Sequence, residues 1–178
     1  MKTATQSKKT SLKRFLRKRA IYYFLPNVCF NFIIAYASFQ ELGYTHFFAG
    51  PQSLARLTLP MAIFLPVILT MDIINRVIVA SKQELIEVAI DHKLNKNKFI
   101  TKLCLLHGIA TGLLVFAVLL LAQQSLTVNH KLDPTLMALL DAVLAGLLSI
   151  LFTYLPIYRL KKHFHQPLSK VQIEIADH

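Results

Sequence analysis

Three polar side chains near the end of one long apolar stretch fall on one face of a helix. Asp72, Asn75 and Arg76 have the spacing i, i+3, i+4 and lie close to the end of the run Leu57–Ile78. An acid, an amide and a base in this arrangement could form a polar site at the mouth of a transport pathway, helped by backbone loosened at Pro66. In the other interpretation, Arg76 extends to the membrane surface and neutralises Asp72, so that the pair serves as an anchor.

Asp141 is a second acidic residue placed inside an apolar stretch. It lies about two helical turns into the last such stretch, with no basic residue near it in the sequence. A carboxylate within a membrane is a candidate site for protons or ions. Alternatively, it stays hydrated at the outer interface, or hydrogen-bonds to Thr135 or another helix. Asp72 and Asp141 are expected toward opposite membrane faces, so we do not expect them to form a single site.

The remaining reactive side chains form no pattern typical of catalysis or of cofactor binding. A membrane haem needs paired axial histidines, but only His107 lies within an apolar stretch. His163 and His165 could chelate a metal, although such pairs in a chain tail are more often solvated. Cys29 and Cys104 lie in different stretches and form no disulfide framework. We therefore expect no enzyme activity, no cofactor and no metal site.

Four long apolar stretches must position these side chains. Of the 178 residues, 54% are hydrophobic and 16% are charged, whereas a soluble domain has roughly a quarter charged residues. Each stretch is long enough to cross a bilayer. We predict an all-α membrane protein with four transmembrane helices, at about residues 20–40, 57–78, 99–121 and 135–158. The corresponding domains are a cytoplasmic tail, a membrane domain and a second cytoplasmic tail, at residues 1–19, 20–162 and 163–178.

The polar segments beside these helices also carry local signals. Ser11–Arg19 could form a short helix on the membrane surface, or belong to a disordered tail. Ser81 and Glu84 have the spacing of a capping box, and the apolar residues that follow share one helical stripe. We therefore predict an amphipathic helix over residues 81–98. Asp133–Pro134 is typical of a helix start, with aspartate as the N-cap and proline at the first helical position.

The basic residues predict the orientation of the chain. Eight Lys and Arg residues precede the first apolar stretch, six flank the central connector and four follow the last stretch, whereas the two opposite loops hold only Arg56 and Lys131. This asymmetry places both termini and the connector in the cytoplasm, and Tyr22 and Tyr23 fit an interfacial aromatic belt. The net charge of +11 comes from residues that flank apolar stretches. It therefore indicates contact with anionic lipid head groups, and no nucleic-acid partner is expected.

Small residues suggest how the helices pack. Gly108 and Gly112 form a G-x-x-x-G pair in the third stretch, and Ala142 and Gly146 form a similar pair in the fourth. Small residues at this spacing let helices approach closely in lipid. We therefore predict a tight contact between the third and fourth helices.

The two halves of the chain can be aligned. FLPNVCFNFIIA from Phe24 matches FITKLCLLHGIA from Phe99 at an offset of 75, and TMDIINR from Thr70 matches TYLPIYR from Thr153 at an offset of 83. Both halves would run in-out-in, as two hairpins forming a parallel internal repeat. Chance similarity between two hydrophobic segments is the other explanation.

Two segments resemble each other in a further way. In LARLTLPMAIFLPVILTMDIINRV (54–77) and LLSILFTYLPIYRLKK (147–162), an apolar run containing proline closes on basic residues. In these segments the chain resembles a group of small bacterial inner-membrane proteins built of one or two transmembrane hairpins and known only as a domain of unknown function. The resemblance implies location in the inner membrane. It brings no activity and no functional residue.

Two kinds of function fit these features. The small size, the lack of a polar binding cluster and the small-residue helix faces favour an accessory or structural subunit that associates with another membrane protein or with itself. The alternative is a small oligomeric transporter or channel that uses Asp141 and Asp72. A membrane enzyme acting on lipid or quinone has no motif to support it. We favour the accessory subunit.

Overall fold

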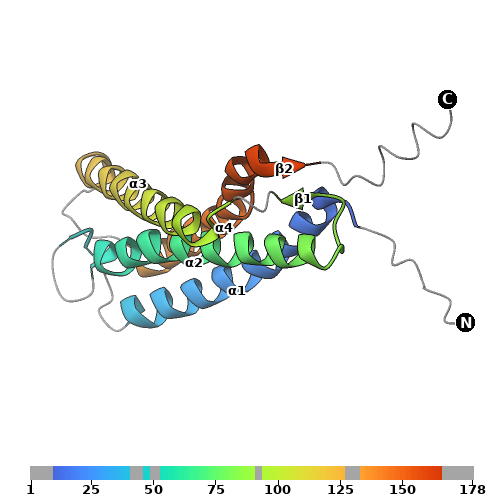
Figure 1. Ribbon diagram of the computed structural model, residues 1–178. Helices are drawn as coiled ribbons and strands as arrows, with labels where there is room; N and C mark the ends of the chain where they lie inside the picture. Colours follow the sequence, from blue (N-terminus) through green and yellow to red (C-terminus); the bar gives the residue numbers. More distant parts are fainter. Residues whose placement is uncertain (1–9, 41–45, 49–52, 91–93, 127–132, 166–178) are drawn as a thin grey trace, which may run out of the picture.

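Four long helices make up most of the described chain (Figure 1). The structure is a computed structural model, and it describes residues 10–40, 46–48, 53–90, 94–126 and 133–165. The helices are α1 (Leu12–Gln40), α2 (Leu54–Lys82), α3 (Lys96–Leu126) and α4 (Pro134–Leu160), followed by the 3₁₀ turn η1 (Lys161–His163). Two short strands are β1 (Ala89–Ile90) and β2 (Phe164–His165). All four long helices have the length and composition to cross a membrane, which confirms the predicted four apolar helices and fits a multi-pass membrane protein.

The helices extend beyond the apolar stretches that predicted them. Ser11–Arg19 forms neither a separate surface helix nor a disordered tail, because α1 continues without a break from Leu12 into the apolar stretch. Lys, Arg and Leu are good helix formers, and no breaker separates the basic turns from the apolar ones. The predicted start of α4 is confirmed, since the Asp133 side chain accepts a hydrogen bond of 2.7 Å from the Leu136 backbone N–H.

The predicted amphipathic helix over residues 81–98 is wrong. Ser81 lies in the last turn of α2 instead of capping a new helix. Glu84 has a φ of 54°; its N–H donates to Ser81 O, and the Leu85 N–H donates to Ala80 O. These are the two bonds of a Schellman motif, which ends a helix with a residue in the left-handed conformation.

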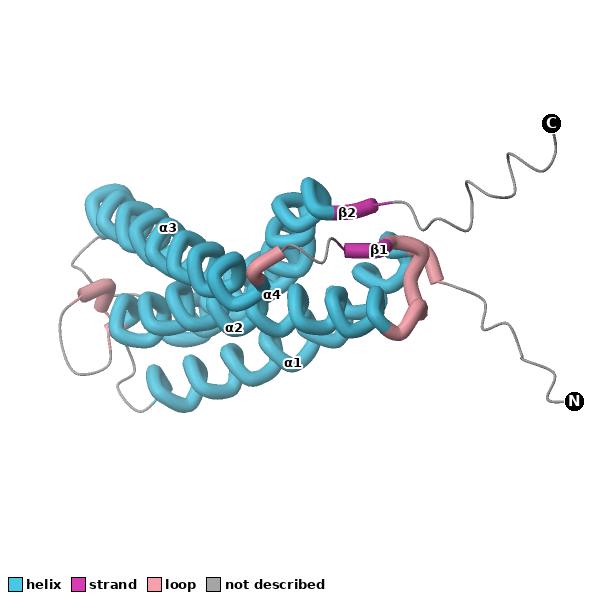
Figure 2. Tube along the Cα trace, in the orientation of Figure 1, coloured by secondary structure: helices cyan, strands magenta, loops and turns pink. Residues whose placement is uncertain are grey.

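After this turn the chain is extended. It pairs there with a residue at each end of the described chain, near Thr10 and near Phe164. Ile86 forms a parallel bridge with Thr10, and β1 pairs antiparallel with β2 (Figure 2). Ile86 is only 2% exposed, whereas the adjacent Leu85 is 46% exposed. This alternation is the period of a strand and differs from that of a helix.

The long helices lie in the spatial order α1–α4–α2–α3. α1 packs mainly along α4, and α2 packs on both α3 and α4. Helices adjacent in the sequence, α1 with α2 and α3 with α4, make much less contact with each other. The helices therefore form an open arrangement, in which α1 and α3 are edge helices with one main neighbour each. The topology of two in-out-in hairpins stays a prediction.

The predicted contact between Gly108 and Gly112 of α3 and the small residues of α4 is wrong. A Cβ added at Gly108 would lie 2.8 Å from Val67 of α2, and one added at Gly112 would lie 2.6 Å from Ile63 of α2. A Cβ added at Gly146 of α4 would lie 2.7 Å from Phe24 of α1. The glycines do permit close approach, but the partners are branched and aromatic side chains on other helices.

Ala142, the fourth small residue, is 2% exposed on the buried side of α4. No spacing pattern in the sequence distinguishes a small residue that meets another small residue from one that receives a large side chain. The prediction therefore identified closely packed positions without identifying their partners.

Apolar cores lie at both ends of the helix set. At the end where α1 begins and α2 and α4 finish, called here the basic end, Leu16, Ile86 and Leu160 share one core. At the opposite end, called the loop end, Phe39 and Phe47 share another. Large apolar side chains on all four helices remain exposed on the outer surface, as expected for a surface that faces lipid.

Candidate functional site

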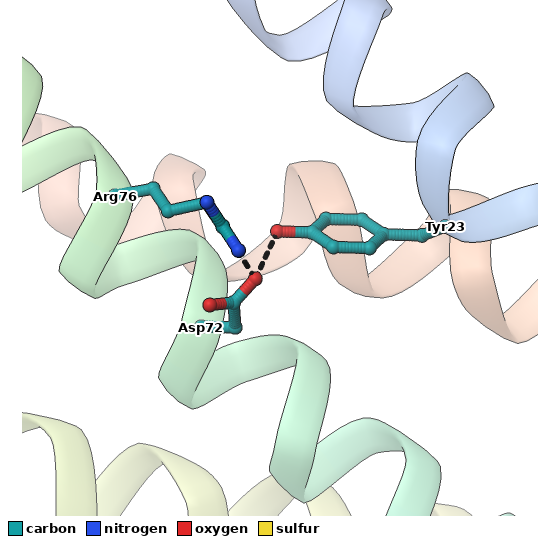
Figure 3. A network of polar contacts seen from close by, with 3 residues as sticks. All are labelled: Tyr23, Asp72 and Arg76. Carbon is teal, nitrogen blue, oxygen red and sulfur yellow. Dashed lines mark hydrogen bonds and ion pairs between the residues drawn. The ribbon is translucent and has the colours of Figure 1, made fainter.

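The first polar cluster joins α1 to α2 near the basic end. Arg76 donates Nε–H to Asp72 Oδ2 at 2.6 Å, which is the contact expected from their i, i+4 spacing. Tyr23 reaches across from α1 and donates its hydroxyl to the same oxygen at 2.5 Å (Figure 3). Asp72 therefore has a cation and a phenol as partners. The arrangement connects two helices whose backbones make little contact.

A pocket lies beside this cluster, between α1 and α2. Its volume is about 350 Å³, and its lining residues include Phe15 and Arg19 of α1 together with Asp72, Asn75 and Arg76 of α2. Asn75 Oδ1 is buried and has no hydrogen-bond partner among the described residues. The sequence-predicted trio is therefore brought together at one pocket, and one of its buried acceptors is unpaired within the described chain.

Asp141 has a partner that the sequence did not identify. It is 4% exposed on α4, and its Oδ1 accepts a hydrogen bond of 2.8 Å from the Thr58 hydroxyl of α2. Of the alternatives considered for Asp141, the structure shows the hydrogen bond to another helix, and the partner is not Thr135. The carboxyl group is thus held between two helices, and this hydrogen bond connects α4 to α2.

Asp72 and Asp141 lie far apart, as expected. Thr58, which contacts Asp141, and Asp72 are both on α2, and their separation of 14 positions corresponds to about 21 Å along the helix axis. The two carboxylates therefore belong to separate sites.

Other buried polar groups between these levels also pair across helices. Asn27 of α1 donates to Ser149 Oγ of α4 at 2.9 Å. Thr70 of α2 and His107 of α3 share a hydrogen bond of 2.9 Å. In lipid, such bonds connect helices because no water competes for the polar groups.

The described side chains among the candidate histidines and cysteines make packing contacts or lie at the surface. His163 packs edge-on against Phe99 with 5.7 Å between ring centroids, and the side chain of His165 lies outside the described residues. Cys104 is buried and donates its thiol to Val67 O, whereas Cys29 is exposed. Within the described part of the chain, no three metal-binding side chains gather.

Sequence reasoning did not identify the hydrogen-bond partners of the two aspartates, Tyr23 for Asp72 and Thr58 for Asp141. Tyr23 was interpreted as part of an interfacial belt together with Tyr22, which is in fact 58% exposed. A helical period separates the faces of Tyr22 and Tyr23, but it does not say which face meets another helix. Thr58 was one of several hydroxyl residues in apolar stretches, and its partner is 83 residues away in the sequence.

Comparison with known proteins finds no matching family, no similar curated protein and no similar solved structure.

Proposed function

We propose that this integral membrane protein is a small accessory or structural subunit, which associates within the membrane with another membrane protein or with a second copy of itself. Both termini would be cytoplasmic, with the basic end on the cytoplasmic side of the inner membrane.

The surface of α1 is the observation that supports this proposal. α1 has the lowest mean hydropathy of the four helices, yet only 11% of its most apolar 18-residue stretch is buried, against 50% for α4. It also carries Pro26 at an exposed position in its apolar half. A membrane helix that is less apolar than its neighbours normally faces protein. A partner lying along α1 would remove this surface from lipid.

The small-residue faces no longer support association. The glycines of α3 and α4 are occupied by side chains of α2 and α1, so they are not available to an outside partner. Apart from Asn75 Oδ1, the buried polar groups discussed above likewise bond within the chain. The exposed face of α1 is left as the candidate interface.

Purification from its native membrane in a mild detergent, followed by mass determination, tests the proposal. We expect a complex with a second membrane protein or a homo-oligomer. The double variant F30A/I34A removes two side chains, 64% and 53% exposed, from one face of α1 and is expected to reduce the complex about tenfold, as the loss of two interface anchors would.

The matched control is L114A/V118A, which removes side chains of similar exposure, 65% and 54%, at the same spacing on the other edge helix, α3. Recovery of wild-type protein as a solitary monomer would refute the proposal. Equal loss from both double variants would show that α1 is not the interface.

The buried Asp141 favours one alternative, a small oligomeric transporter or channel. A carboxylate that is 4% exposed inside a transmembrane helix is costly to retain for structure alone. Proton flux into liposomes containing the protein tests this function. If the protein is a transporter or channel, the wild type should show a proton flux and D141N should abolish it. D133N is the control, because asparagine caps a helix as well as aspartate does and Asp133 lies at the start of α4. Absence of any wild-type flux removes the alternative.

A further inference from the structure

The pocket between α1 and α2 has features that a protein partner on the outer face of α1 does not explain. It lies at the basic end and is lined mainly by apolar surface, including Phe15, Val79 and Leu85. Charged and amide groups lie on the same walls. A volume of about 350 Å³ is at the lower end of the range for small-molecule pockets.

The first of these features is a pair of guanidinium groups, one from each helix. Arg19 of α1 is held over the Phe15 ring, with 5.3 Å between its guanidinium carbon and the ring centroid. Arg76 of α2 donates Nε to Asp72. The Arg76 side chain is 45% exposed, so its guanidinium group is accessible to a ligand beyond this contact. Arginine nitrogens in this situation are suited to bind phosphate oxygens.

The second feature is an acceptor without a donor. Asn75 lines the pocket, and its buried Oδ1 has no partner among the described residues. An unpaired buried acceptor is destabilising unless a ligand supplies the missing bond. A simple inorganic anion is a poor hydrogen-bond donor to such an oxygen, whereas an ammonium or hydroxyl group can donate to it.

The location of the pocket indicates which ligand could supply both a phosphate group and a hydrogen-bond donor. Basic pockets between transmembrane helices at the cytoplasmic side bind phospholipid head groups, and the apolar part of this pocket suits the first part of an acyl chain. Asp72 lowers the net positive charge of the pocket, which disfavours a multiply charged anion and is compatible with a head group that carries a donor.

We propose that this pocket binds the head group of a glycerophospholipid that carries a hydrogen-bond donor in addition to its phosphate, as phosphatidylglycerol and phosphatidylethanolamine do. Arg19 and Arg76 bind the phosphate, and Asn75 accepts the hydrogen bond from the hydroxyl or ammonium group. The proposal requires the membrane location and is independent of any protein partner.

Native mass spectrometry of the full-length, delipidated protein tests this site. The protein is titrated separately with phosphatidylglycerol, phosphatidylethanolamine and phosphatidylcholine, the last of which has a phosphate but no donor. We expect the first two to bind about tenfold more tightly than phosphatidylcholine, which is the effect of one hydrogen bond to a charged or unpaired group. N75L should remove this preference, and R19Q should weaken the binding of all three lipids about tenfold.

R14Q is the matched control, because Arg14 is an exposed residue of the same helix that does not line the pocket. Equal losses in R14Q and R19Q would refute the site in favour of diffuse charge attraction. Displacement of lipid by millimolar inorganic phosphate would identify a free-anion site and refute lipid binding. If R19Q does not fold, R19K keeps the charge without the planar fork and should weaken binding less than tenfold; unchanged binding in R19K would count against the site.

Discussion

Tyr23 makes a contact that depends on the tertiary structure. Its hydroxyl and Arg76 Nε both donate to Asp72 Oδ2, so the tyrosine connects α1 to a charged pair on α2. Tyr22, one position earlier, points to the outside. Adjacent residues of the same type thus have different roles because a helix turns by about 100° per residue.

Removing the Tyr23 hydroxyl should therefore weaken the fold. We expect Y23F to lower the free energy of unfolding by about 1 kcal/mol, a typical value for a hydrogen bond between membrane helices. Thermal unfolding in detergent measures the change. Y22F is the control and should unfold like the wild type; equal effects of both variants would contradict the role of the Tyr23–Asp72 bond.

Thr58 and Asp141 form the corresponding pair near the loop end. T58V keeps the shape of the side chain but removes the donor to a buried carboxylate, so we expect a loss of about 1 kcal/mol in unfolding free energy. D141N retains an acceptor for Thr58 and should cost less. T101V, at an exposed position of α3, is the control. If T58V and T101V unfold alike, the hydrogen bond does not contribute to stability.

At the scale of the elements, α2 and α3 approach closely because glycines on α3 receive Ile63 and Val67. G112A should be destabilising by about 1–3 kcal/mol through overpacking, partly offset by the better helix propensity of alanine. Adding I63A should restore most of the loss, since Ile63 supplies the atoms that a Cβ at Gly112 would meet.

The comparison with G146A makes this test specific. Gly146 contacts Phe24 and Val28 of α1, so I63A should leave the unfolding temperature of the G146A protein as low as before. Rescue of both glycine variants by I63A would indicate a general effect on stability and contradict the assigned contacts.

The extended connector is the second element whose structure is testable. In a helix, Leu85 and Ile86 would lie along the same apolar stripe, but in the strand they face opposite sides. We expect I86A to cost about 2–4 kcal/mol, because Ile86 is 2% exposed in the core at the basic end. L85A should cost much less at 46% exposure. Similar losses in urea or thermal unfolding would support the helix instead.

At the scale of the whole molecule, the order α1–α4–α2–α3 is unchanged when the two halves of the chain are exchanged. α1 with α4 and α3 with α2 are then equivalent pairs, and α2 with α4 is the central pair. This order is what a duplicated hairpin would produce if each copy packed across the other. The duplication remains a prediction.

The orientation is a separate prediction at this scale. The excess of Lys and Arg at the basic end should place both termini in the cytoplasm. A fluorescent protein fused after His178 is expected to fluoresce, and alkaline phosphatase fused after Phe48 is expected to be active. The reverse pattern of activities would show that the chain is inserted the other way round.

The sequence by itself determined the class of protein, the approximate places of four helices, the start of α4 at Asp133 and the contact between Asp72 and Arg76. These features depend on hydrophobic length or on residues within one helical turn of each other. Such local properties are encoded where they occur, because a 3.6-residue period places i and i+4 together whatever surrounds the helix.

Only the tertiary structure decided which faces meet. It paired Gly112 with Ile63 instead of with α4, gave Asp141 to Thr58, and converted the connector around Ile86 into a strand. All four long helices are apolar on most sides, since lipid replaces water around them, so polarity does not mark the inner face as it does in a soluble protein. Shape complementarity and scattered hydrogen bonds between distant residues select the partners, and neither has a local signature in the sequence.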